Sequence, residues 1–411
     1  MSCGQTKTVV IGTVGAGYAA YLHGNGYEKV NGVSVRLKTV CDLNLPLAEK
    51  VKERYGYEQA VSDYRLLLED PEIEVIDIVL PPFLHTSIAI EAMEAGKHVI
   101  CEKPLTGYFG RPGQENIGVT VPKSEMLSQC LAEMDRLKEV VEKTGKKFMY
   151  AENFVYATPV QKAAEIIRAK KTKLLFMKGE ESLKGSSSPV AGKWNKTGGG
   201  TLMRTGTHPM GGMLWLKQQE AAARNEEITV KSVSCDVGCA TRCLTGDEHR
   251  HIAAQPEDVE DYGVISVTFS DGTKALCIAS DTVLGGTKNY IEIYGNNTAL
   301  NCNITPTDLL NTYFLDEDGL EDVEISEMLP AKLGWNKAFV NDEIIRGYMG
   351  ELQDFMEAVA YDRAPASGFS LAYETTKVFA ELKYTKKHLV IKYLAFCSLV
   401  DIQYYIYYNK L

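Results

Sequence analysis

The sequence predicts an α/β protein in which an N-terminal, doubly wound Rossmann domain precedes a C-terminal α+β domain with a large, mostly antiparallel open sheet. Three observations predict this. Apolar strand patterns alternate with helix patterns through the first 150 residues, as in parallel sheets with right-handed crossovers. A glycine-rich turn follows the first strand pattern, and after residue 151 the strand patterns follow one another more directly.

Length and charge set the broad class. The chain has 411 residues, beyond the roughly 250–300 at which single cores stop growing. We therefore expect domains at 1–151 and 152–387, followed by an atypical tail at 388–411. A net charge of −10 and a pI near 5.4 argue against sequence-independent binding to nucleic acid or an anionic membrane. Without a charged-then-apolar leader, and with ten cysteines mostly in apolar runs, we expect reduced thiols and a cytoplasmic location.

In the first domain, apolar runs that predict strands are each followed by a helix pattern. The run at 75–80 is interpreted as an entirely apolar, buried strand, and Gly96 is expected to end the helix after it. The strands are expected at 9–12, 33–41, 75–80, 98–101 and 147–151, and the helices at about 18–28, 47–55, 63–70, 86–95 and 124–143.

The second domain reads as one helix and then successive strands. An Asp271-Gly272 turn predicts a hairpin, and an open sheet leaves one face for a partner subunit, which predicts a homo-oligomer (a dimer or tetramer). The tail has no run of about 20 apolar residues, so an extra packed element or a non-native sequence is favoured over a membrane anchor. Strands are expected at 173–182, 228–240, 262–270, 273–281, 288–295 and 298–303, helices at 159–169, 342–361 and 370–385, and loops at 110–118 and 184–200.

The first turn predicts a dinucleotide site. It has the form Gly15-x-Gly17-x-x-Ala20 between a strand and a helix, so that a pyrophosphate can approach the backbone at a helix N-terminus. Asp42 ends the second strand, where a carboxylate would bind ribose hydroxyls and repel a 2′-phosphate, which favours NAD over NADP. The alternative is an ordinary turn and a surface carboxylate. The residues expected to contact NAD here are Gly12, Val14, Gly15, Ala16, Gly17, Tyr18 and Asp42.

Ligands of such sheets bind outside the carboxyl ends of the strands, and the sequence places polar groups there. Leu80, Pro81, His85, Glu102 and Lys103 are the further candidates for cofactor contacts, although His85 could equally cap a helix.

Lys103 and His208 are the candidate catalytic residues. Pro104 restricts Lys103 to extended geometry, which would direct its ammonium out of the sheet edge. His208 follows a glycine run at a predicted helix start, and an imidazole can exchange a proton near neutral pH. The alternatives are a surface lysine and a capping or core histidine.

With the glycine turn, Glu102-Lys103-Pro104 and the Gly-Gly…His208 segment, residues 7–385 resemble the glucose–fructose oxidoreductase/inositol dehydrogenase (Gfo/Idh/MocA) family. The resemblance implies two domains, frequent oligomers and sugar or cyclitol substrates. It also implies that Lys103 and His208 lie at the substrate carbinol, with the nicotinamide opposite.

The sequence departs from the family at two places. Arg204 occupies the position four residues before His208 where many members carry Asp. On one helical turn its repulsion of ~3 kcal/mol would keep His208 neutral; otherwise Arg204 contacts an acidic or polyhydroxylated substrate, or turns away into a salt bridge. Pro82-Phe83 replaces a polar residue and would change the wall around the nicotinamide.

Four further residues, Glu152, Asn153, Tyr156 and Trp194, are candidate substrate contacts or structural residues. Cys235, Cys239 and Cys243 do not have the spacing of a usual zinc site, so we expect no metal.

We therefore expect an NAD-dependent oxidoreductase that oxidises or reduces a secondary hydroxyl of a sugar, glycoside or cyclitol, with a keto-glycoside as one product considered. One alternative is a glycoside hydrolase or lyase that oxidises its substrate transiently, with Tyr150, Tyr156 or Glu152 as an additional base. The other is a non-enzymatic NAD-sensing regulator, against which the presence of both Lys103 and His208 argues.

Overall fold

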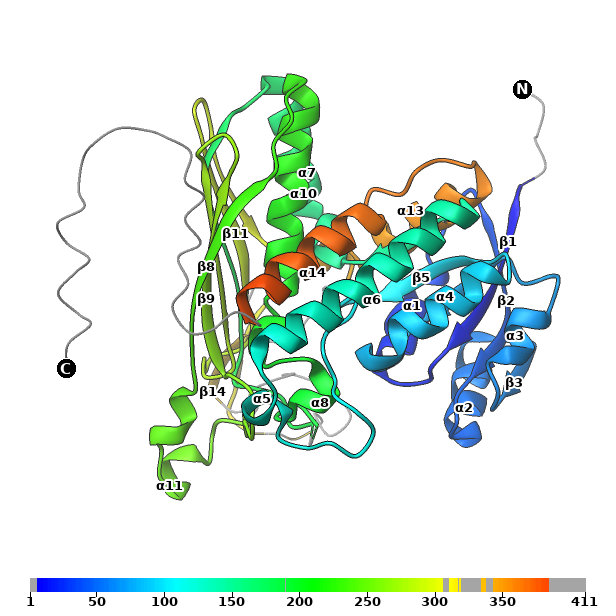
Figure 1. The fold of residues 1–411 in the computed structure, drawn as a ribbon, viewed down its shortest axis with the longest axis horizontal. Helices are drawn as coiled ribbons and strands as arrows, with labels where there is room; N and C mark the ends of the chain where they lie inside the picture. Colours follow the sequence, from blue (N-terminus) through cyan, green and yellow to red (C-terminus); the bar gives the residue numbers. More distant parts are fainter. Residues whose placement is uncertain are drawn as a thin grey trace.

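The computed structural model describes residues 6–188, 190–305, 310–316, 318, 334–337 and 343–383, so the predicted tail at 388–411 lies outside the described residues. Two six-stranded sheets dominate this part of the chain (Figure 1). None of the described helices combines the length and apolar composition that crossing a bilayer requires.

The N-terminal sheet is parallel throughout and doubly wound, as predicted. Its order is β3-β2-β1-β4-β5-β6, and the order reverses beside β1, where such sheets bind ligands. Glu102 pairs with Ala151, so the carboxyl ends of β5 and β6 meet at one edge. The strands are β1 (Thr8–Val14), β2 (Ser34–Cys41), β3 (Gln59–Val61), β4 (Val75–Ile78), β5 (His98–Glu102) and β6 (Phe148–Ala151).

The helices of this half follow the predicted order. The loop predicted at 110–118 runs into a short helix, α5. The helices are α1 (Tyr18–Tyr27), α2 (Leu45–Tyr55), α3 (Arg65–Glu69), η1 (Pro82–Leu84), α4 (His85–Glu94), α5 (Ile117–Thr120) and α6 (Lys123–Thr144).

The second sheet is mixed and mostly antiparallel. Its order is β12-β11-β7-β10-β9-β8, and β7 with β10 is its parallel pair. Helices α7 and α10 cover the face toward the N-terminal half (Figure 1). The strands are β7 (Leu174–Ser182), β8 (Val230–Gly238), β9 (Tyr262–Phe269), β10 (Lys274–Ser280), β11 (Lys288–Gly295) and β12 (Ala299–Asn303), with a small hairpin of β13 (Asn311–Phe314) and β14 (Gly334–Lys337).

The helices of this half differ from the prediction at two places. The loop predicted at 184–200 contains α8, and the helix predicted at 342–361 is divided into α12 and α13 at Gly347. The helices are η2 (Asn153–Val155), α7 (Thr158–Lys170), α8 (Trp194–Thr197), α9 (Thr201–Arg204), α10 (Thr207–Arg224), η3 (Ala240–Cys243), α11 (Gly246–His249), α12 (Glu343–Arg346), α13 (Tyr348–Ala360) and α14 (Phe369–Lys383).

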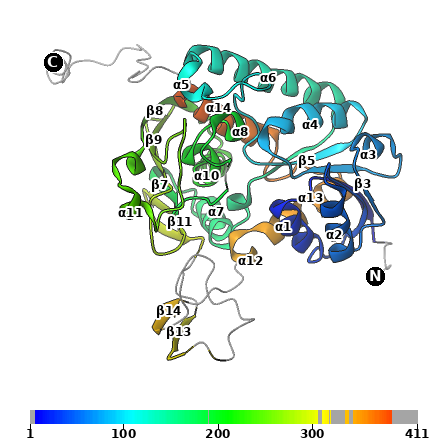
Figure 2. The ribbon, with the colours of Figure 1, turned by 90° about the horizontal axis from the view of Figure 1, so that it is seen from below.

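The chain returns to the first half at its C-terminal end. Helix α13 packs on α1, and α14 packs along α6 (Figures 1 and 2). Leu352 of α13 shares a buried cluster with Ile11 of β1 and Phe154 of η2. One buried cluster therefore contains residues of both halves, with β1, η2 and α10 among its elements.

Candidate active site

The glycine turn fits a dinucleotide. Gly15 has a φ of +115°, and a Cβ there would lie 2.5 Å from the carbonyl oxygen of Val79, so only glycine fits. A Cβ on Gly17, the N-cap of α1, would meet no atom within 4 Å, which leaves room before a helix N-terminus for a pyrophosphate. The Asp42 carboxylate accepts the N–H of Ala16 at 2.9 Å and directly follows β2.

Gly12 and Val14 support this turn from below. Val14 is buried, and a Cβ on Gly12 would lie 2.9 Å from Ile73 Cδ1. Tyr18, by contrast, is 73% exposed. Of the residues predicted to contact NAD, those of the glycine turn thus offer their backbone to the cofactor, whereas Gly12 and Val14 pack beneath the turn.

Gly17→Ala and Gly15→Ala should separate cofactor binding from folding. Gly17→Ala places a methyl group in open space, so the melting temperature should be unchanged while the dissociation constant for NAD⁺ rises by about tenfold or more, because close backbone approach is lost. Gly15→Ala should also destabilise the fold by about 1–3 kcal/mol through its backbone strain. Calorimetric titration and thermal unfolding measure both, and unchanged NAD⁺ affinity in Gly17→Ala would contradict the assignment.

His85 joins two loops. Its ring is fully buried, with Nδ1 2.8 Å from the carbonyl oxygen of Pro104 and Nε2 2.8 Å from that of Leu80. Burial lowers the pKa of His85 more than the two carbonyl groups raise it, so the ring is neutral and donates to one carbonyl at a time. The expected cofactor contact of this side chain is not supported; it fixes the loop of Leu80 and Pro81 instead.

Lys103 reaches from the end of β5 to the second half. Its Nζ donates to the carbonyl oxygen of Arg204 at 2.9 Å, and its peptide bond to Pro104 is cis. Glu102 accepts the backbone N–H of Lys103 at 3.0 Å. Burial would raise the pKa of Glu102, but the hydrogen bond to His23 and the nearby positive charges lower it overall.

His208 is oriented by Glu152. The Nδ1 atom of His208, near the start of α10, lies 2.8 Å from Glu152 Oε1, and its ring stacks on Phe154 with centroids 5.1 Å apart. Glu152 follows β6 and is fully buried. The expectation that Glu152 contacts substrate is therefore corrected: its carboxylate holds the imidazole.

Lys103 and His208 converge on one turn. The ammonium of Lys103 binds the carbonyl group four residues before His208, and Glu152 follows the strand next to β5. The structure thus brings the two candidate catalytic residues from different halves of the chain to the turn between α9 and α10.

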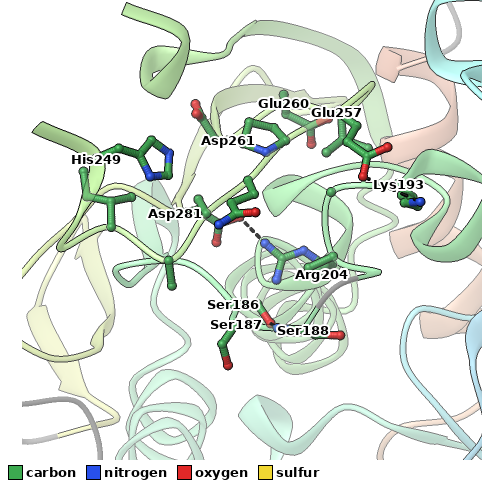
Figure 3. A pocket seen from close by; sticks show the side chains of 18 of the residues that line it. Ser186, Ser187, Ser188, Lys193, Arg204, His249, Glu257, Glu260, Asp261 and Asp281 are labelled. Atoms are coloured by element: carbon green, nitrogen blue, oxygen red, sulfur yellow. Dashed lines mark hydrogen bonds and ion pairs between the residues drawn. The ribbon is translucent and has the colours of Figure 1, made fainter. Parts of the chain in front are cut away.

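Arg204 does not share a helical turn with His208. Helix α9 ends at Arg204 and α10 begins at Thr207, and the guanidinium forms an ion pair with Asp281 (Figure 3). The expected repulsion with His208 is therefore wrong, and the salt-bridge alternative is confirmed. Burial raises the pKa of Asp281, although Arg204 opposes the shift.

Arg204→Met should lower the free energy of unfolding, because it leaves the buried carboxylate of Asp281 without its ion-pair partner. The side chain of Asp281 is 6% exposed, and an unpaired buried carboxylate destabilises a fold by about 3–5 kcal/mol. Arg54→Met, which breaks the exposed ion pair with Glu28, should change stability by less than about 1 kcal/mol. Denaturant unfolding compares them, and equal losses would contradict this account.

A cavity of about 670 Å³ surrounds the Arg204–Asp281 pair (Figure 3). The carbonyl oxygen of Arg204 accepts the hydrogen bond from Lys103, and Arg204 also lines the cavity. The cavity therefore lies beside the catalytic candidates, neither of which lines it. Its walls come mainly from residues 186–188 and 191–193 and from residues between 246 and 261.

Three predicted substrate contacts are internal. The Asn153 amide donates to the carbonyl oxygen of Arg346 at 2.9 Å. The Tyr156 hydroxyl donates to Asp354 at 2.7 Å. Trp194 is buried, with Lys123 Nζ 3.8 Å from its ring centroid. These three side chains hold the scaffold, and their assignment to substrate is corrected.

The wall at Pro82-Phe83 is aromatic. Phe83 is 40% exposed and packs edge-on against Phe109, with centroids 6.1 Å apart.

No group of three or more His, Cys, Asp or Glu residues suited to a metal occurs among the described residues, Cys235, Cys239 and Cys243 included.

The sequence analysis missed a buried acid and histidine below the site. Asp77 interrupts β4, which was expected to be wholly apolar, and it contacts His23 of α1 at 3.0 Å. The signal was the carboxylate itself, within the run Val-Ile-Asp-Ile, since a charge in a buried strand needs a partner.

Two family models match the chain. The model described as an oxidoreductase family with an NAD-binding Rossmann fold matches residues 9–110, and the Gfo/Idh/MocA C-terminal domain matches residues 173–301. Together they cover more than half of the chain.

Individual proteins are similar over longer spans. Levoglucosan dehydrogenase from Pseudarthrobacter phenanthrenivorans is 26% identical over 90% of this chain and 93% of its own length. Myo-inositol 2-dehydrogenase from Thermotoga maritima is 29% identical over 23% of this chain and 28% of its own length. The structure of GenD2 from gentamicin A biosynthesis, in complex with NAD, superposes with a TM-score of 0.70 at 18% identity, covering 91% of this chain and 93% of that one.

The glycine turn, the Glu-Lys-Pro strand end and both family models agree, and the fold matches in both halves. The chain belongs to the Gfo/Idh/MocA family of oxidoreductases, whose cofactor is NAD.

Proposed function

We propose that this protein is a dehydrogenase that transfers a hydride between NAD and a secondary hydroxyl carbon of a sugar, glycoside or cyclitol. The observation that carries the proposal is the convergence of Lys103 with the His208–Glu152 pair on one turn. The residues at Gly15, Gly17 and Asp42 would hold NAD, which supplies the hydride acceptor when bound.

His208 and Lys103 have different roles in handling the proton and the charge of the substrate hydroxyl. Glu152 holds Nδ1 of His208, so Nε2 is the nitrogen that takes the hydroxyl proton as a carbinol is oxidised, and the carboxylate stabilises the imidazolium that forms. The ammonium of Lys103 donates a hydrogen bond to the oxygen as negative charge develops there. In the reverse direction the same groups return the proton.

The relatives and the cavity support a carbohydrate substrate. The names of two relatives specify levoglucosan and myo-inositol, both rich in secondary hydroxyls. The cavity beside Arg204, about 670 Å³, falls within the usual range for small-molecule sites and would give a glycoside room beside the catalytic candidates, with a keto-glycoside as its oxidation product.

The three residues considered as an additional base for the hydrolase or lyase alternative are poorly suited to that role. Tyr150 is fully buried, the Tyr156 hydroxyl is bound to Asp354, and Glu152 is bound to His208. The dehydrogenase is therefore favoured.

The test is NADH formation with a panel of sugars, glycosides and inositols. We expect NADH to accumulate in step with oxidised carbohydrate for at least one member. Cleavage of a glycoside with no net NADH would establish the alternative, and failure of calorimetry to detect NAD⁺ binding would overturn the proposal.

We also propose a homo-oligomer formed through the open face of the second sheet. Phe176 of β7 and Tyr294 of β11 are register partners, and their exposed rings stack with centroids 6.1 Å apart. Phe176→Glu should reduce the mass measured by light scattering, because it places a charge in an apolar contact. Leu66→Glu, on exposed α3, should not; a monomeric parent protein would contradict the proposal.

A further inference from the structure

A buried chain of hydrogen-bonding groups runs from α1 to Lys103. Tyr27 Oη donates to Asp77 Oδ2 at 2.9 Å, and His23 Nδ1 lies 3.0 Å from both oxygens of Asp77. On the other side of the ring, His23 Nε2 lies 3.4 Å from Glu102 Oε1. Glu102 Oε2 in turn accepts the Lys103 N–H at 3.0 Å. His23 and Asp77 are 1% and 0% exposed.

The geometry requires a charged ring at His23. Both ring nitrogens face carboxylates, which only accept hydrogen bonds when ionised, whereas a neutral imidazole donates from one nitrogen alone. An imidazolium donates to Asp77 from Nδ1 and forms an ion pair with Glu102 from Nε2, at 3.4 Å. Burial lowers the pKa of His23, but Asp77 and Glu102 raise it further, to well above its ordinary value. The formal charges of Asp77, His23, Glu102 and Lys103 then alternate and sum to zero.

Besides His23, Lys103 and His208 lower the pKa of Glu102, each by less than His23 does. Burial raises the pKa of Glu351, Tyr348 and Tyr150, which favours their neutral forms. The titratable groups that face this chain are Tyr27 from α1, Tyr57, Asp77 from β4, Cys101 and Lys103 beside Glu102, Tyr150 from β6, Glu152, His208 from α10, and Tyr348 and Glu351 from α13.

We propose that His23 is a positioning residue of the active site and acts through Glu102: its positive charge keeps Glu102 an anion, and Glu102 fixes Lys103 beside the substrate. His23 touches neither substrate nor cofactor. This inference rests on the proposed function only in the role that it gives to Lys103.

The test is the pH profile of kcat/KM for NADH formation in His23→Gln. The uncharged amide removes the largest of the positive influences on the buried Glu102 carboxylate, so the pKa of Glu102 rises. The Glu102 anion exists above that pKa and is lost as the pH falls, so the acid limb should move up by at least about one pH unit. Rates should approach those of the parent protein at alkaline pH.

His98→Gln is the matched control, since His98 lies at the other end of β5 and accepts the Lys147 N–H. It should leave the acid limb in place. A purely structural role for His23 would lower the rate equally at every pH, and such a parallel profile would overturn the inference.

A second measurement does not depend on activity. In protein labelled with ¹⁵N-histidine, the signals that His23→Gln removes belong to His23, and they should show an imidazolium at pH 8. A neutral ring would overturn the inference. If the imidazolium is found but no sugar, glycoside or cyclitol yields NADH, the proposed function fails while the charge arrangement stands.

If His23→Gln does not fold, Glu102→Gln is the second variant. It removes one of the two carboxylates that stabilise the imidazolium, so His23 should titrate at lower pH than in the parent protein. An unchanged titration of His23 would show that the two residues are not coupled and would overturn the inference.

Discussion

Lys103→Ala is expected to lower kcat by about 10³-fold or more, because an oriented cation at a developing oxyanion and a proton-exchanging group each contribute roughly 10²–10³. The dissociation constant for NAD⁺ should stay within about threefold, since the glycine turn and Asp42 bind the cofactor through other groups. Single-turnover kinetics and calorimetric titration measure the two quantities.

Lys138→Ala is the control for a lost lysine, since Lys138 lies on the exposed side of α6 and should leave kcat unchanged. Turnover in Lys103→Ala at the parent rate would remove Lys103 from the mechanism. A large loss of NAD⁺ affinity with normal kcat at saturation would make it a cofactor ligand instead.

Glu152→Gln is expected to lower kcat by about 10²–10⁴-fold with little change in KM. The carboxylate accepts from Nδ1 of His208 at 2.8 Å and so leaves Nε2 free to accept a proton. A glutamine amide can donate to Nδ1, which places the proton on Nε2 and gives the tautomer that cannot act as the base.

Glu220→Gln distinguishes this effect from a loss of stability. Glu220 is also fully buried, on α10, where it forms an ion pair with Lys217. Its replacement should lower the melting temperature without a comparable loss of kcat. If the two variants lose activity in proportion to their stability, Glu152 has only a structural role.

The architecture could be predicted because each half has its own local pattern. Alternating strand and helix signals define the first sheet, and the Gly15 and Gly17 turn, Lys103 and His208 are marked by short motifs. These signals depend on neighbours in sequence, which is why the two candidate catalytic residues could be named before the fold was known.

The partners of buried charges could not be predicted in the same way. Glu152 is 56 residues from His208, and Asp281 is 77 residues from Arg204. Which carboxylate meets which cation depends on strand order and on where α9 ends. From sequence, a salt bridge was one of the alternatives for Arg204 and a structural role one of those for Glu152, but neither partner, Asp281 or His208, could be named.

The packing of α13 on α1 has a consequence for dissecting this protein. Leu352 of α13 lies against Gly26 of α1, so a fragment that ends near residue 151 would leave an apolar stripe of the nucleotide-binding half in water. Such a fragment should aggregate unless residues 348–360 are supplied, in cis or as a peptide.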